Sequence, residues 1–498
     1  MCFLHESNLG KDAIASQSAR LGVFAHHGNT PHGIRLAVEH AMKEGLAKFV
    51  ICTSTLAQGV NLPIRYLIVT STRQGSASIK VRDFHNLIGR VGRSGMHTEG
   101  SVLFANPEIY DNRRMHSEER RWTEVKQLLL PEKSEPCAST LLSVFEPLHS
   151  DDRKRHLRMK PLDFVGIYIN DPSALDHIPR DIAALHGDHG FTERGLADQI
   201  AYKRNILSAI ESYLMAYWDE SSAGTGEEEL ADFARATLAY HLAIEEENTR
   251  GRLVTLFQLL GANIKAKVPR VDRRKVFGKT LYGVPDSLAI EKWVVQNAGR
   301  VVACANEEQL FSVLWPILAQ NVHNAAFRSC NPAEILQELA LGWIQGLPFH
   351  QLCSLLSDNN VRFGFGKLAR HPQLEHVVDI CENALAYDGM LAIGAVAEIF
   401  DLLRPEDDTA SDNLRRLQKR LKYGLPSALD IMIYEVGFCD RVISIDLGKV
   451  LGAASSRKNA VQQIKRQEKQ IRETLDKYPA YFIEMLGRML GDEQREHS

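Results

Sequence analysis

Several features that would place this sequence in a special class of protein are missing. Its eight cysteines include no C-x-x-C pair, which argues against a zinc module or a disulfide framework and is typical of a reducing compartment. No apolar run reaches the roughly 18 residues of a membrane-spanning helix, and no charged segment precedes an apolar one at the start. The formal net charge is only −3. These absences predict a soluble, cytoplasmic globular protein without a membrane partner.

Two motifs of ATP-hydrolysing enzymes are also missing. No G-x-x-x-x-G-K-[ST] loop occurs; the nearest string, Gly278–Thr280, has Arg273 where the first glycine would stand. No D-E-x-[HD] follows an apolar strand, because Asp492–Arg495 lies in a polar tail. We therefore expect neither the backbone cradle for ATP phosphates nor the carboxylate for Mg²⁺ in this chain. No histidine or cysteine spacing predicts a metal site.

The length of 498 residues suffices for about three domains. Residues 1–118 alternate apolar runs, at 21–25, 49–52, 66–69 and 101–104, with helical patterns. This alternation predicts a parallel sheet with both faces covered. From about residue 119 long amphipathic stretches predict a mainly helical region; they include 193–218, 226–249 and 456–475.

Two arginines, Arg90 and Arg93, are separated by three positions at the end of a helix predicted at about 83–91, between the last two strands. On a helix, residues three apart share one face, and Gly89 and Gly92 leave room for close approach. Such a face offers two planar cations to one phosphate group, and an arginine from a neighbouring domain can stabilise phosphoryl transfer. The alternative is a solvated basic helix end.

Small hydroxyl residues and a glycine follow the predicted strand at 49–52. The segment Thr53–Pro63 contains Thr53 and Thr55, which can hydrogen-bond phosphates, and Gly59, which permits close backbone approach. The carboxyl end of a strand is where α/β sheets bind ligands. The alternative is an ordinary connection built from turn-forming residues.

In order and spacing, these two segments resemble motifs V and VI of superfamily 2 DEAD/DEAH-box helicases. Together with His27-Gly28, Arg35, Glu39 and Gly45, they resemble the second RecA-like domain of the superkiller-type branch. The resemblance implies an α/β RecA-like part followed by a large mainly helical region. It predicts the RecA-like domain over 1–118, a helical connector over 119–220 and a helical C-terminal region over 221–498.

The resemblance also implies a role for individual residues. Arg90 and Arg93 would be catalytic, contacting the γ-phosphate of ATP, with Arg93 as the arginine finger. Gly59, Asn61 and Asn86 would contact the nucleotide, although Asn86 is shorter than the glutamine of many relatives. The backbone of single-stranded DNA or RNA would be held by Thr53, Thr55 and Arg35.

Because the phosphate cradle is missing, we expect the chain to be the C-terminal portion of an ATP-dependent helicase. ATP and Mg²⁺ would then be held mainly by an N-terminal RecA-like half that is absent here, and the strand that opens the second domain would be absent or confined to the first few residues. This chain alone is expected to be inactive. The alternative is a non-catalytic nucleic-acid-binding or scaffold protein derived from a truncated helicase, such as one in bacterial defence.

Charge and glycine patterns add further candidates. Residues 1–114 hold 13 Lys and Arg against 8 Asp and Glu, which suits a phosphate-bearing partner. The basic stretch 265–279 either follows a phosphate backbone or forms a solvated surface. Three stretches, 342–348, 423–426 and 437–441, resemble helical C-terminal regions of related bacterial helicases or are simply turns between core helices.

Overall fold

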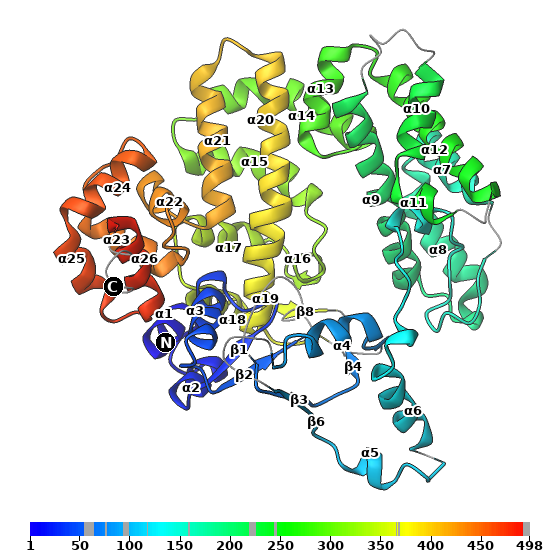
Figure 1. Cartoon of the computed structure of the whole chain (residues 1–498). Helices are drawn as coiled ribbons and strands as arrows, with labels where there is room; N and C mark the ends of the chain where they lie inside the picture. The colour runs from blue at the N-terminus through cyan, green and yellow to red at the C-terminus, as the bar shows by residue number, and fades with distance from the viewer. Residues whose placement is uncertain are drawn as a thin grey trace. The chain divides into compact units, whose positions relative to one another are not determined.

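The computed structural model describes residues 1–53, 64–74, 77–92, 99–116, 118–157, 160–218, 226–243, 247–364, 366 and 369–491. The chain divides into two compact units (Figure 1). The first unit consists of Met1–Pro136, Val322–Asp388 and Lys419–Ser498, and the second of Cys137–Asn321 and Gly389–Gln418. Each unit is therefore assembled from segments that lie far apart in the sequence.

The first segment of the first unit mixes strands and helices. In chain order it contains α1 (Cys2–Leu9), α2 (Ile14–Arg20), β1 (Val23–His26), α3 (His32–Lys43), β2 (Phe49–Cys52), β3 (Tyr66–Val69), β4 (Arg73–Gln74), β5 (Ala77–Ser78), α4 (Val81–Ile88), β6 (Ser101–Phe104), α5 (Glu108–Asp111), α6 (Glu119–Leu128) and a 3₁₀ turn (Pro131–Lys133).

Two parallel strand pairs form the sheet structure of this segment. β1 pairs with β2, with Val23 opposite Phe49, and β3 pairs with β6, with Tyr66 opposite Ser101. The predicted strands and their parallel pairing are confirmed. The first strand begins two residues later than predicted, because Gly22 follows α2 with a positive φ of 75°. Of the two alternatives for the opening strand, confinement to the first few residues is excluded, because α1 occupies them.

Helix α3 connects the parallel strands β1 and β2. Ile34, Val38 and Ala41 recur at helical spacing in the sequence, and all three are buried on the apolar face of this helix. The helix ends as the sequence indicates: Gly45 has a φ of 68°, and the amide of Leu46 donates to the carbonyl of Ala41 over 2.8 Å. Together with β1, this helix fixes the strand ends that carry the candidate site.

One face of the strand pairs is apolar and exposed. Five side chains that alternate along β2, β3 and β6 are each at least half exposed; they are Phe49, Ile51, Tyr66, Ile68 and Leu103. The sequence predicts that helices cover both faces, as in most parallel sheets, and for this face the prediction is wrong. The opposite side of β3 and β6 is covered in this way, by Phe84 of α4.

The later segments of the first unit are helical apart from a short hairpin. They contain α16 (Ala325–Arg328), β7 (Cys330–Asn331), α17 (Ile335–Ile344), α18 (Phe349–Asp358), β8 (Arg362–Phe363), α19 (Leu374–Val378), a π-helix (Asp379–Gly389), α22 (Ala428–Glu435), α23 (Arg441–Val450), α24 (Arg457–Arg466), α25 (Glu468–Leu475) and α26 (Ala480–Leu490). In this unit α26 packs against α3 and α18 packs against α1 (Figure 1).

Buried Asp440 joins the start of the chain to the last helices. One carboxylate oxygen caps α23 by accepting from the amides of Val442 and Ile443, and the other accepts from Asn8 Nδ2 over 3.1 Å. A Cβ at Gly33 would lie 2.4 Å from this side chain, so the close approach of α3 requires glycine. The α/β segment and the C-terminal helices are consequently parts of one core.

Glu382, on the π-helix, makes the stability of the first unit depend on pH. Its carboxylate accepts from the His32 amide over 3.3 Å, and burial raises its pKa to about 7. The surrounding charged or titratable groups are Arg35, Arg441, Asp440 and Tyr434. The folded-state pKa lies above the unfolded value, so its stabilising contribution is complete below about pH 4.5 and is lost as the pH rises through 7.

We therefore expect the free energy of unfolding of this unit to fall by about 1–3 kcal/mol between pH 4.5 and 8 on account of Glu382. Glu382→Gln should remove that part of the fall, because the amide stays neutral. Thermal unfolding of both proteins across this pH range measures the difference, with exposed Glu375→Gln as the matched control. Parallel pH profiles of wild type and Glu382→Gln would contradict the prediction.

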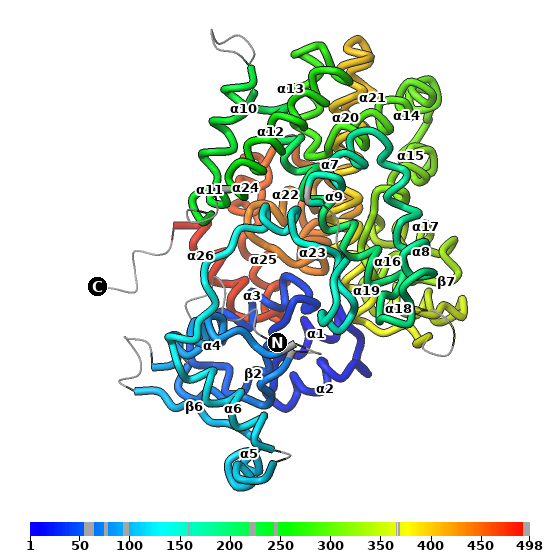
Figure 2. Tube along the Cα trace, turned by 90° about the vertical axis from the view of Figure 1, so that its right-hand side faces the viewer, coloured from blue at the N-terminus to red at the C-terminus, as the bar shows by residue number. Residues whose placement is uncertain are grey.

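The second unit is helical. It contains 3₁₀ turns (Thr140–Val144 and Gly187–His189), α7 (Pro161–Asn170), α8 (Ala174–His186), α9 (Glu193–Tyr217), α10 (Gly226–Arg235), α11 (Leu238–Leu242), α12 (Glu247–Lys267), α13 (Val271–Thr280), α14 (Val284–Val302), α15 (Glu307–Asn321), α20 (Met390–Leu403) and most of α21 (Asp408–Tyr423). Figure 2 shows α7, α9, α10 and α12 gathered in this unit, where α9 packs against α8, α12 and α13.

The large helical region predicted from the sequence is confirmed, with two local differences. The stretch 456–475 is divided at Gln467 into α24 and α25. The expected helix over 226–249 is interrupted, because Thr237 caps a new helix by accepting from the Tyr240 amide. Within the described residues, no helix has both the length and the apolar character needed to cross a membrane.

Candidate functional site

Two of the predicted nucleic-acid contacts lie by the carboxyl ends of β1 and β2. Thr53 directly follows β2 and is exposed, and its amide donates to the carbonyl of His26 at the end of β1 over 3.4 Å. Arg35 is in the first turn of α3, the helix that follows β1. The parallel pairing thus brings these two residues to the same edge of the sheet.

Neighbouring side chains hold the first turns of α3 in place. Arg35 is half-buried, and its Nη2 lies 3.3 Å from Nδ1 of His32. Buried His26 lies 2.7 Å from the carboxylate of Glu39, through its Nε2. Glu39 is one of the residues that carry the resemblance to the second RecA-like domain. Its contact with His26 therefore holds α3 against the end of β1.

The segment that carries Arg90 does not form the continuous helix that the sequence suggests. Helix α4, with Asn86 on its exposed side, ends at Ile88. Half-buried Arg90 lies in the following turn, where its amide donates to the carbonyl of Leu87. The expected continuation of the helix up to residue 91 is therefore wrong, and the helical face expected for both arginines includes Arg93, which lies outside the described residues.

Gly92 explains why the helix stops. It has a φ of 71°, and its amide donates to the carbonyl of Ile64 over 2.8 Å instead of continuing the helix. A Cβ on this residue would lie 2.8 Å from the backbone nitrogen of Gly100. Gly92 is thus required by the close approach of its own backbone to Gly100, next to the point where Val91 forms a parallel bridge with Ile64. Ile64 follows directly after Thr53–Pro63, so the two motif segments meet at this point.

Four predicted site residues lie outside the described residues: Thr55, Gly59, Asn61 and Arg93. In the part of the chain that the structure describes, no group of three or more histidine, cysteine, aspartate or glutamate side chains is placed to hold a metal ion.

Several cations of the basic stretch 265–279 form hydrogen bonds and ion pairs within the second unit. Arg274 is almost fully buried and donates to the carbonyl of Val268, and Arg273 forms an ion pair with Glu291. Lys267 donates to the carbonyl of Ile169 over 2.5 Å. Because these cations hold helices together, the structure favours packing over a continuous strip for a phosphate backbone.

Sequence reasoning assigned no role to Arg441, around which three glycine-containing stretches meet. Its Nε donates to the carbonyl of Gly424 over 2.8 Å, and its Nη2 donates to the carbonyls of Trp343 and Leu347. Gly424 has a φ of 60°, as a turn requires. The signal in the sequence was the recurrence of turn glycines beside aromatic and charged residues, but spacing alone does not reveal that the stretches touch.

Comparison with known families identifies one segment of this chain. Residues 2–95 match the model of the helicase conserved C-terminal domain. The matched segment contains β1, α3, β2, β3 and α4, and hence all of the predicted site residues. The match covers less than a fifth of the 498 residues.

Curated relatives are similar over the same length of chain. The Hachiman protein HamB of Bacillus cereus is 37% identical over 97 residues, which are 19% of this chain and 9% of that protein. The helicase POLQ-like of Caenorhabditis elegans is 38% identical over 92 residues, 18% of this chain and 10% of the relative. The ATP-dependent DNA helicase Hel308 of Aeropyrum pernix is 36% identical over 86 residues, which are 16% of this chain and 12% of that protein. The chain thus matches about a tenth of each relative.

Proposed function

We propose that this chain is the C-terminal portion of an ATP-dependent nucleic-acid helicase of the superkiller-type branch. The observation that carries the proposal is the helicase C-terminal domain match over residues 2–95, shared with relatives named as helicases. In this proposal residues 1–118 are the second RecA-like domain, and 119–220 and 221–498 are helical regions that follow it.

The residues of the sheet edge would act on two ligands. Thr53, Thr55 and Arg35 hold the backbone of a single DNA or RNA strand, and Gly59, Asn61 and Asn86 approach the nucleotide. Arg90 and Arg93 stabilise charge on the γ-phosphate. The meeting of Ile64 with Val91 supports this division, because it brings the ends of the two motif segments together.

ATP hydrolysis further requires a partner RecA-like domain. A loop of backbone amides, a lysine and a carboxylate must hold the phosphates and Mg²⁺, and the sequence offers no carrier for them. The exposed apolar face formed by Phe49, Ile51 and the side chains of β3 and β6 supports an additional covering layer. ATP would bind between the two RecA-like domains.

The test is an ATPase assay with saturating single-stranded DNA or RNA. The chain alone should show no turnover, because arginines act only on a phosphate that other groups hold. Mixing it with a separately made first RecA-like domain should restore turnover, and a P-loop lysine variant of that added domain is the control. Turnover by the repurified chain alone would refute the requirement for a partner. Strand binding without turnover in the mixture would favour the alternative, a non-catalytic nucleic-acid-binding or scaffold protein.

A further inference from the structure

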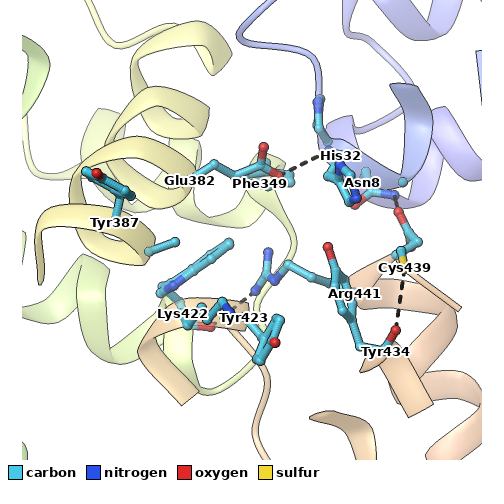
Figure 3. A pocket seen from close by; sticks show the side chains of 15 residues that line it. Asn8, His32, Phe349, Glu382, Tyr387, Lys422, Tyr423, Tyr434, Cys439 and Arg441 are labelled. Carbon is cyan, nitrogen blue, oxygen red and sulfur yellow. Dashed lines mark hydrogen bonds between the residues drawn. The ribbon is translucent and has the colours of Figure 1, made fainter. Parts of the chain in front are cut away.

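A cavity of about 340 Å³ opens within the first unit. Its described lining contains none of the residues with a proposed helicase role. The walls come from the start of α3, from Trp343 and Phe349, from the π-helix, and from segments before and at the start of α23 (Figure 3). Its volume is in the lower part of the range of small-molecule sites.

Arg441 lines this cavity, and one nitrogen of its guanidinium makes no hydrogen bond among the described residues. The residue is only 6% exposed, and its guanidinium carbon lies 3.8 Å from the centre of the Trp343 ring. Nε and Nη2 donate to three backbone carbonyls, whereas Nη1 has no hydrogen-bond partner among the described residues. Figure 3 shows the guanidinium directed into the space between Glu382 and Lys422. Nη1 is not one of the fully buried atoms that lack a partner, so it is accessible from the cavity and can donate a charge-assisted hydrogen bond to an anion there.

The π-helix supplies another part of the lining. Asp379–Gly389 is an eleven-residue π-helix, a rare conformation that is enriched at functional sites. It places Glu382 inside the cavity and Tyr387, which is 60% exposed, in the lining. Tyr387 thus presents an aromatic surface that is accessible to a ligand.

The two cations of the lining favour an anion. Lys422 is exposed and adds a second cation to Arg441. Asp440 opposes them, but both of its oxygens already accept hydrogen bonds. Because burial raises the pKa of Glu382 to about 7, this carboxyl is partly neutral at physiological pH and can donate to a ligand oxygen.

We propose that this cavity binds a phosphomonoester, with Arg441 Nη1 and Lys422 Nζ on the phosphate and the Tyr387 ring against the attached group. A phosphomonoester carries close to two charges at neutral pH, and guanidinium and ammonium groups are its usual ligands. An aromatic ring beside them suits a nucleobase. The phosphomonoester is either a free nucleoside monophosphate or the phosphorylated end of a strand. Its binding does not require ATP turnover.

Calorimetric titration of the full chain tests the proposal with four probes: inorganic phosphate, AMP, and a short oligonucleotide with either a 5′-phosphate or a 5′-hydroxyl. Lys422→Gln should weaken phosphate and AMP binding by about tenfold. Lys419→Gln removes the same charge three residues earlier and should have no effect. Tyr387→Ala should weaken AMP binding but not phosphate binding.

The probes also distinguish the two sources of the ligand. Tighter binding of the 5′-phosphorylated oligonucleotide than of its hydroxyl counterpart identifies a strand end, whereas equal binding of both, with AMP still bound, identifies a free nucleotide. Arg441→Lys adds a second variant, used only if its circular dichroism matches that of wild type. The proposal is overturned if no probe binds, or if Lys422→Gln binds every probe as wild type does.

Discussion

Replacing Arg93 with alanine should lower ATP turnover by about 10³-fold or more, in this chain combined with a partner RecA-like domain. The arginine finger meets charge that develops on the γ-phosphate in the transition state, so its removal lowers kcat far more than it changes ATP affinity. Affinity for a single strand should be nearly unchanged. Steady-state ATPase kinetics and strand-binding anisotropy measure the two effects separately.

A control for this substitution lies on the preceding helix. Arg82 is exposed on α4, so Arg82→Ala removes an arginine from the same region without touching the proposed finger. This control should retain turnover. Equal rates for Arg93→Ala and Arg82→Ala would remove the assignment of Arg93 and leave the pair as a solvated basic segment.

The geometry before Arg93 explains why such a substitution is informative. Gly92 is fixed by its hydrogen bond to Ile64 and by its close approach to Gly100. Gly92 itself therefore has a defined backbone position. In phosphoryl transfer, positioning and electrostatic stabilisation supply nearly all of the catalysis.

Much of the first segment could be predicted because its signals are local. The apolar runs predicted the strands. The helical spacing of apolar residues, followed by Gly45, indicated where α3 ends. The boundaries of α4 could not be predicted in the same way. Its start at Val81 depends on Glu135, whose carboxylate accepts from the amides of Val81 and Arg82, and its end depends on Ile64. Both partners are remote in sequence.

Distance in the sequence also limited what could be said of the charged residues. One interpretation of the basic stretch 265–279 was a solvated surface, because the acidic partners of Arg273 and Lys279 lie outside the stretch. Glu291 pairs with Arg273, and Glu398 lies 3.9 Å from Lys279. Arg441 contacts Trp343 from 98 positions away. The roles of Thr55, Gly59, Asn61 and Arg93 stay predictions from the sequence motifs, as do the domain boundaries at 118 and 220.

Glu211→Ala should destabilise the second unit by about 3–5 kcal/mol. Glu211 is fully buried in α9, and burial raises its pKa. It accepts hydrogen bonds of 2.7–2.8 Å from the hydroxyl of Tyr168, the amide of Asn263 and the backbone nitrogen of Val284. These donors belong to α7, α12 and α14, so one carboxylate links three helices to a fourth. Alanine leaves all three donors buried without their acceptor and creates a cavity.

Hydrogen exchange followed at individual peptides is the appropriate measurement, because a chain with two compact units need not unfold in a single step. In Glu211→Ala the amides of α9 and the start of α14 should lose protection, while those of α3 in the first unit should not. Glu211→Gln keeps one carbonyl oxygen as an acceptor and should lose less protection, and exposed Asp198→Ala on the same helix should lose none. If Glu211→Ala and Asp198→Ala exchange alike, the carboxylate does not hold these helices together, and the stability of the unit must come from its apolar contacts alone.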